Sequence, residues 1–80
     1  MNVEVRLFAT LREYLPAGSG RTSAQIEMQE GTRICDLLDR LGIPAAIAHL
    51  VLVDGRYEAD RTRELQDGCA VSIWPPIGGG

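Results

Sequence analysis

Three stretches of the chain alternate apolar and polar residues, a pattern of period two that is typical of strands with one buried face. They cover residues 3–7, 22–28 and 69–74. The first two are expected to pair as an antiparallel hairpin that opens the fold, with the first strand inside the sheet. The residues expected to face the core are Val3, Val5, Leu7, Ala24, Ile26, Met28, Cys69, Val71 and Ile73.

A different spacing between residues 32 and 42 predicts the main helix. Apolar residues recur there at positions i, i+3, i+4 and i+7, which places them on one face of a helix. Thr32 is expected to cap the start, and Gly42 stands where a left-handed residue commonly ends a helix. The apolar face consists of Ile34, Leu37, Leu38 and Leu41.

The remaining segments predict shorter elements. Residues 8–15 have helical spacing, with Thr10 as the expected cap, and a loop rich in Pro, Gly and Ser follows them. Leu50–Val53 is a continuous apolar run and is expected to be a strand buried on both faces. Asp54 and Gly55 then predict a tight turn into a short strand.

The predicted order is strand, strand, helix, strand, short strand, strand. Packing one amphipathic helix over one face of a mixed sheet buries both apolar surfaces economically. We therefore predict an α+β fold of the ubiquitin-like β-grasp class, with four to five strands on one main helix. Residues 1–74 are expected to form this domain, and residues 75–80 a flexible tail.

Composition narrows the class of protein. Eighty residues with 45% hydrophobic content suffice for one domain with a single core. The 8 basic and 11 acidic residues are interspersed, so no basic stripe is available for nucleic acid. No apolar stretch approaches the roughly 18 residues that span a bilayer, and no signal sequence is evident, so we expect a cytoplasmic protein without a membrane partner.

Few side chains offer chemistry of their own. Cys35 and Cys69 lack the paired spacing of a zinc site and are interpreted as packing residues, with a persulfide-carrying thiol as the alternative. His49 is the only histidine and is given no role, because general base catalysis needs an aligned partner. All eight basic residues are arginine, so the chain has no lysine that another carrier could acylate. We expect no metal site.

The last six residues form a distinct segment. Pro75 and Pro76 stop sheet pairing and favour an extended backbone, and three glycines follow Ile77. Composition alone also fits a frayed terminus or a cloning scar. The functional interpretation is that a partner draws the terminal carboxylate into a narrow channel, which glycine permits because it has no β-carbon.

These features together resemble a known family. The segment Leu7-Phe8-Ala9-Thr10-Leu11-Arg12-Glu13, the Asp67-Gly68 turn and the Pro-Pro ending with Gly79 and Gly80 are similar to the small subunit of molybdopterin synthase and its ThiS-like sulfur-carrier relatives. The resemblance covers essentially all 80 residues, and the first-loop segment favours the molybdopterin type over the thiamine type. The chain departs from the usual pattern at Gly78, which gives the tail three glycines instead of two.

The resemblance implies a sulfur carrier without catalytic side chains or a bound cofactor. In such carriers an E1-like adenylyltransferase uses ATP and magnesium to adenylate the terminal carboxylate, here that of Gly80. A persulfide donor then converts the adenylate to a thiocarboxylate. The acceptor is a cyclic pterin on the large subunit of molybdopterin synthase, which holds the catalytic residues and receives the inserted tail. The tail residues are Pro75, Pro76, Ile77, Gly78 and Gly79.

The resemblance also implies a partner-binding surface. Phe8, Tyr57 and Trp74 match the hydrophobic patch of the family. Arg12 matches the Arg-Glu segment of the family, which implies a pair with an acidic group of the adenylating enzyme; the alternative is a solvated surface arginine. Parity supports Trp74 most directly, because Val71 and Ile73 already occupy core-facing positions. Phe8 and Tyr57 are equally compatible with core packing.

Three other functions remain open from the sequence. The first is a ubiquitin-like modifier that forms isopeptide bonds through Gly80. The second is a carrier that delivers sulfur to thiamine, cysteine or tRNA by the same tail chemistry. The third is an interaction module without tail chemistry, whose function would not change when Gly79 and Gly80 are deleted.

Overall fold

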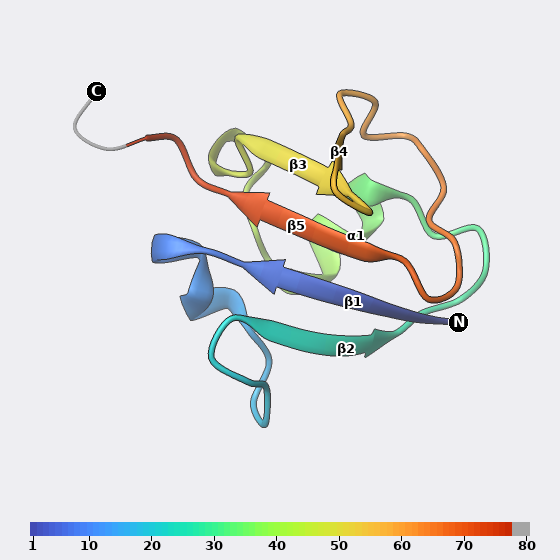
Figure 1. Cartoon of the computed structure of the whole chain (residues 1–80), viewed down its shortest axis with the longest axis horizontal. Helices are drawn as coiled ribbons and strands as arrows, with labels where there is room; N and C mark the ends of the chain where they lie inside the picture. The colour runs from blue at the N-terminus through green and yellow to red at the C-terminus, as the bar shows by residue number, and fades with distance from the viewer. Residues whose placement is uncertain (78–80) are drawn as a thin grey trace.

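Five strands form a single mixed sheet, and the α-helix lies against one face of it (Figure 1). The computed structural model describes residues 1–77 of the chain. The elements in chain order are β1 (Asn2–Leu7), η1 (Ala9–Tyr14), β2 (Ser23–Glu27), α1 (Ile34–Leu41), η2 (Ala45–Ile47), β3 (Leu50–Val53), β4 (Arg56–Tyr57) and β5 (Ala70–Trp74), of which η1 and η2 are 3-10 helices.

The strand order in the sheet is β2-β1-β5-β3-β4. The two central strands, β1 and β5, are parallel, with Val5 opposite Val71, and every other pair is antiparallel. The first strand therefore lies inside the sheet and pairs with the second, as predicted. The architecture confirms the predicted ubiquitin-like β-grasp fold with five strands. Within residues 1–77, no helix is long and apolar enough to cross a membrane.

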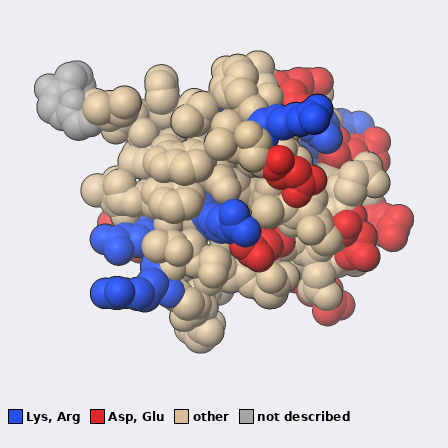
Figure 2. Space-filling model, viewed as in Figure 1, with Lys and Arg blue, Asp and Glu red and all other residues tan. Residues whose placement is uncertain are grey.

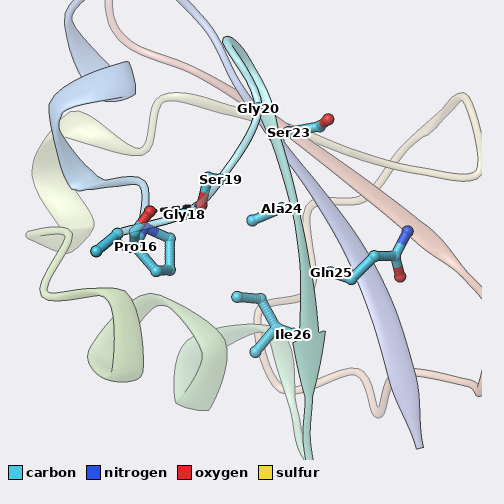
Figure 3. Close-up of a pocket in the computed structure, with 9 residues that line it drawn as sticks. Pro16, Gly18, Ser19, Gly20, Ser23, Ala24, Gln25 and Ile26 are labelled. Carbon is cyan, nitrogen blue, oxygen red and sulfur yellow. Dashed lines mark hydrogen bonds between the residues drawn. The ribbon is translucent and has the colours of Figure 1, made fainter.

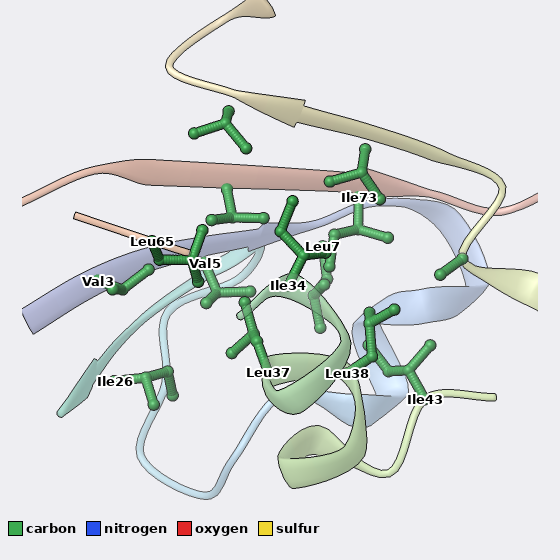
Figure 4. Close-up of a cluster of buried hydrophobic side chains, with 14 of the residues drawn as sticks. Val3, Val5, Leu7, Ile26, Ile34, Leu37, Leu38, Ile43, Leu65 and Ile73 are labelled. Atoms are coloured by element: carbon green, nitrogen blue, oxygen red, sulfur yellow. The ribbon is translucent and has the colours of Figure 1, made fainter. Parts of the chain in front are cut away.

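The core lies between the sheet and α1 (Figure 4). All nine strand residues predicted to face inward are buried, and Ile34, Leu37 and Leu38 of the helix pack against them. Leu41 is only half-buried at the last turn of α1. The alternating strands and the helical stripe therefore predicted most of the core. The core also contains Leu11, Ile43, Ala48, Val51, Val53 and Leu65.

The start of α1 differs from the prediction. The helix begins after Arg33, and the Asp36 carboxylate accepts a hydrogen bond from the Arg33 backbone N–H at 3.0 Å. The Thr32 hydroxyl instead donates to the Gln29 carbonyl oxygen, so the prediction of Thr32 as the cap was wrong. Gly42 ends the helix with φ at 77°, in the left-handed region, as expected.

The short helix after β1 also begins without the predicted cap. The extended residue before η1 is Phe8, and no side chain caps the first turn, so Thr10 does not have the expected role. Leu11 is fully buried beneath η1 and attaches this turn to the core. Burial of one leucine therefore holds a helix that local capping does not favour.

The strand β3 is not buried on both faces. Val51 and Val53 point into the core, whereas Leu50 and Leu52 are half-buried on the opposite face. The prediction of a doubly buried strand was wrong because α1 covers only one side of the sheet. The uncovered side, termed the outer face below, contains the candidate site.

Candidate functional site

The chain leaves the sheet after β5, at the end of the molecule opposite the N-terminus (Figure 1). Of the predicted tail residues, Pro75 is half-buried, Pro76 is exposed and Ile77 is 94% exposed. The other tail residues, Gly78 and Gly79, lie outside the described residues. The predicted reactive residue, Gly80, lies outside them too. The exposure of the tail therefore rises from the half-buried Pro75 to the almost fully exposed Ile77.

Two aromatic rings stack where the tail begins. The rings of Phe8 and Trp74 have centroids 4.3 Å apart and planes 4° from parallel. The parallel pairing of β1 with β5 places Leu7 opposite Ile73, so the next residue of each strand reaches the outer face side by side. The Phe8 N–H also donates to the Ile73 carbonyl oxygen at 3.3 Å. The structure thus brings together two residues that are 66 positions apart in sequence.

Strand β3 extends this apolar surface across the outer face. Leu50 lies opposite Trp74, and Leu52 lies between Ser72 and Tyr57 in the register. Residues that face each other on neighbouring strands share one face of a sheet, so these side chains adjoin. Tyr57 is 66% exposed, which excludes its interpretation as a core aromatic. We define the outer-face patch as Phe8, Leu50, Leu52, Tyr57 and Trp74.

The charged side chains surround this area more than they enter it. Figure 2 shows uncharged surface from the root of the tail across the upper left of this face, whereas acidic side chains gather on the side of the N-terminus. An apolar centre with a charged surround is the usual make-up of a protein interface. The leucines of the patch were missed in the sequence, and the one available signal was the apolar run in β3, which we had interpreted as core.

Arg12 is exposed on η1, which follows Phe8 at the same end of the molecule as the tail. Its Nε donates to the Ala9 carbonyl oxygen at 3.2 Å, and Ala9 has φ at 53°. This bond holds the Arg12 side chain against the first turn of η1. The bond uses Nε, so the two terminal nitrogens of the guanidinium can still donate to an acidic group of a partner. The structure does not place Arg12 among the stacked residues of the outer-face patch.

The thiols show no sign of activation. Cys69 is buried, and burial is the main cause that raises the pKa of its thiol, which keeps it protonated near neutral pH. Cys35 is half-buried on α1, and the sulfurs do not form a disulfide. Within residues 1–77 no cluster of histidine, cysteine and acidic side chains could hold a metal ion. His49 is exposed, and its backbone N–H donates to the Trp74 carbonyl oxygen at 3.0 Å.

A hollow of about 440 Å³ lies away from the tail, between the loop at residues 16–20 and the edge strand β2 (Figure 3). Ala24 and Ile26 point toward the loop side, and Gln25 points to the other face of the sheet. The hollow contains none of the predicted site residues and no ionisable side chain. The hydroxyl groups of Ser19 and Ser23 line it, but the lining has no base to activate them, so the candidate site remains the outer-face patch with the tail.

The comparisons with known proteins concern the family and the fold. The sequence matches the ThiS family over residues 5–80. No curated protein is similar enough in sequence to count as a match. Among solved structures, the Haloferax volcanii HVO 2177 protein is 30% identical with a TM-score of 0.77, and the alignment covers 100% of this chain and 87% of that one.

Two further structures are similar over nearly their whole length. The putative molybdopterin converting factor, subunit 1, from Pyrococcus furiosus is 28% identical with a TM-score of 0.71, and 95% of this chain and 98% of that chain are covered. SAMP1 from Haloferax volcanii, a small archaeal modifier protein, is 24% identical with a TM-score of 0.73, and both chains are covered completely. The SAMP1 similarity concerns the fold.

Proposed function

The chain belongs to the ThiS family, and from this membership we propose that it is a sulfur carrier for molybdopterin synthesis that works through the carboxylate of Gly80. Its role is that of a small subunit without catalytic side chains. The described residues that support the proposal are the outer-face patch and the proline root of the tail. The observation that carries it is the Phe8–Trp74 stack directly before Pro75.

The specific acceptor is proposed from two features. The protein from Pyrococcus furiosus named as subunit 1 of a molybdopterin converting factor is 28% identical over 95% of this chain, and its name implies a second subunit. The Leu7-to-Glu13 segment and the Pro-Pro ending resemble the same type of carrier. We therefore propose the large subunit of molybdopterin synthase as the partner that receives the tail.

The chemistry of the tail follows from the poor reactivity of a carboxylate. An E1-like adenylyltransferase with ATP and magnesium joins the Gly80 carboxylate to AMP and releases pyrophosphate. A persulfide sulfur then attacks the acyl carbon, and AMP leaves with the electron pair of the broken C–O bond. A second thiol attacks the donor's sulfur in the resulting acyl disulfide, which forms a disulfide with the donor and releases the thiocarboxylate. The thiocarboxylate sulfur is the nucleophile that the carrier delivers. All catalytic side chains belong to the partners.

The outer-face patch supplies the docking surface in this proposal. Aromatic residues that are already fixed in the free protein lose little side-chain freedom on binding, and such residues commonly dominate interface energies. The stack fixes Trp74, which lies directly before Pro75. The partner that covers the patch therefore receives the tail from a defined starting point.

Intact-protein mass tests the carrier chemistry. The chain is incubated with ATP, magnesium, a matching adenylyltransferase and a sulfur donor, and replacement of one terminal oxygen by sulfur adds about 16 Da. A variant that lacks both Gly79 and Gly80 is the matched control and should not change mass, because it no longer ends in a glycine pair. An unchanged wild-type mass, with an enzyme that thiolates its own carrier, would contradict the proposal.

Two companion measurements separate the acceptors. The thiocarboxylated chain mixed with the large subunit of molybdopterin synthase should form a complex and convert the cyclic pterin. Failure to bind that subunit would leave thiamine, cysteine or tRNA as the sulfur acceptor. Isopeptide bonds between Gly80 and lysines of other proteins would instead identify a modifier of the kind that the name of SAMP1 describes.

A further inference from the structure

The chain offers almost no amine to an acylating group. None of the 80 residues is lysine, and the eight basic residues are all arginine. A guanidinium stays protonated near neutral pH and has only donors, so arginine is not an acyl acceptor. The primary amine of the chain is therefore the α-amine of Met1, which donates a hydrogen bond to the Met28 carbonyl oxygen at 2.8 Å.

This amine lies at the wrong end of the molecule for the tail of its own chain. Strands β1 and β5 run parallel, so Met1 precedes the sheet at one end and Pro75 leaves it at the other (Figure 1). The seven residues from Met1 to Phe8 span about 23 Å at strand spacing. The six residues from Pro75 to Gly80 span at most about 20–22 Å. A tail folded straight back would end short of the Met1 amine.

The thiols of the chain compete only weakly for the activated acyl group, because burial limits their access to it. Cys69 is buried, and Cys35 is half-buried within α1. The buried Cys69 thiol cannot approach an acyl group held in the channel of a partner, and the half-buried Cys35 thiol has limited access to it. Within residues 1–77, the side chains therefore offer no exposed thiol or amine to another activated copy.

The absence of lysine prevents the formation of an amide between two carriers. An amine that attacks the acyl carbon of the adenylate forms a C–N bond, AMP leaves with the electrons of the C–O bond, and the amine loses a proton to water. The product is an amide between two carriers, and that carboxyl group can no longer accept sulfur. Each such event would remove one donor from the sulfur cycle.

We propose that this chain is a donor that cannot accept its own activated form: the lack of lysine and the held α-amine keep it from being acylated by other copies. The inference rests on the proposed function and concerns the specificity of the same activated carboxyl group. No side-chain amine of another carrier then competes with the sulfur donor for the adenylate, even where many carriers surround the activating enzyme.

Arg21 provides the test position. It is exposed and precedes Thr22, whose carbonyl oxygen accepts the Leu7 N–H at 2.7 Å, so it lies at the tail end of the sheet. Arg21→Lys adds an amine there with no change of charge, and Arg21→Gln adds none. Both variants and the wild-type chain are incubated with ATP, magnesium and the adenylyltransferase but without a sulfur donor, and pyrophosphate release reports activation.

We expect at least about tenfold more carrier–carrier amide from Arg21→Lys than from wild type or Arg21→Gln, since an amine replaces a guanidinium. The initial burst of pyrophosphate should be equal in all three chains, because the tail is unchanged. Amides in wild type, or an equally inert Arg21→Lys chain, would overturn the inference. Absence of pyrophosphate release from all three would instead contradict the proposed function.

Acetylation by N-hydroxysuccinimide acetate tests the inference without the enzyme. The wild-type chain should gain at most one stable acetyl group per molecule, at Met1. The Arg21→Lys chain should gain a second one, at the amine that the substitution adds. More than one stable acetyl group on the wild-type chain would overturn the inference, whatever the enzyme does.

Discussion

The ring of Phe8 lies flat on the ring of Trp74, with 4.3 Å between their centroids, where the tail leaves the sheet. Phe8 directly follows β1 and Trp74 is the last residue of β5, so the stack joins the ends of the two central strands on the face that α1 does not cover. Aromatic pairs contribute beyond the area that they bury. The position of the tail root therefore depends on a contact between distant parts of the sequence.

A double-mutant cycle measures this contact. Phe8→Ala, Trp74→Ala and the double variant are unfolded in urea, and we expect a coupling free energy of about 0.5–1.5 kcal/mol between the two positions. The matched cycle combines Phe8→Ala with Tyr57→Ala. Tyr57 lies on β4, three strands away from β1, so the effects of these two substitutions on the free energy of unfolding should add. Additive effects in the Phe8–Trp74 cycle would show that the stack contributes nothing to stability.

The sequence predicted the elements whose signal is local. The helical stripe from Ile34 to Leu41 and the alternation in β1 determine which side of each element is buried, and both predictions were confirmed. The cap of α1 was not predicted, because Thr32 and Asp36 both offer an oxygen near the helix start and only the folded geometry selects between them.

The site was predictable only in part, because it depends on strand pairing. Trp74 was placed on the outer face from parity alone, and the family resemblance suggested Phe8 and Tyr57. Nothing local indicates that Phe8 touches Trp74, or that Leu52 lies beside Tyr57, since these contacts follow from the order of strands in the sheet. An apolar run such as that of β3 has the same pattern whether one face or both are covered.

Leu52 tests whether the outer-face patch is the docking surface. Leu52→Asp places a charge in the middle of the patch, and we expect binding to the large subunit to weaken by about tenfold or more, because an unpaired charge must lose its water in the interface. Isothermal titration calorimetry measures the affinity, and circular dichroism checks the fold. The tail is unchanged in this variant.

The control is Gln25→Asp, which introduces the same charged side chain on the same face of the sheet. Gln25 is exposed on β2, opposite Glu4 and at the other edge of the sheet from Tyr57. Its affinity should stay close to that of the wild type. If Leu52→Asp and Gln25→Asp bind equally well, the partner docks on another surface.

Glu58 gives a stability difference that depends on pH. Its carboxylate accepts hydrogen bonds from Arg63 Nη1 at 2.7 Å and from the Asp60 N–H at 3.1 Å, and the bond from Arg63 is the main cause that lowers the pKa of Glu58 in the folded state. The ionised carboxylate therefore stabilises the fold above the unfolded-state pKa. This contribution is lost as the pH falls through the lower, folded-state pKa.

The comparison with Glu58→Gln isolates this effect, because Asp60 and the other acidic residues remain in both proteins. The thermal midpoint of the wild-type chain should exceed that of Glu58→Gln near pH 7, and the difference should shrink between about pH 5 and about pH 2. The contribution is small, since the pair is exposed to solvent and salt. A difference that stays constant over this range would show that the charge of Glu58 has no part in it.

Cys69 is expected to react with disulfide reagents more slowly than Cys35. It is buried, and the raised pKa of its thiol means that the folded state favours the protonated form, which does not attack disulfide reagents. The sign for stability follows: this contribution is fully present below the unfolded-state pKa and is lost as the pH rises through the folded-state value. Alkaline conditions should therefore both destabilise the fold and speed the labelling of Cys69.

The measurement is the rate of reaction with a chromogenic aryl disulfide, in native buffer and in urea. The Cys35→Ser variant reports Cys69 alone, and the Cys69→Ala variant reports Cys35. We expect Cys69 to react at least about tenfold more slowly in the native chain than in urea, because reaction requires the buried thiol to be exposed first. Equal rates in both solvents would mean that Cys69 is accessible, and a persulfide on its sulfur would then have to be considered beside the chemistry of Gly80.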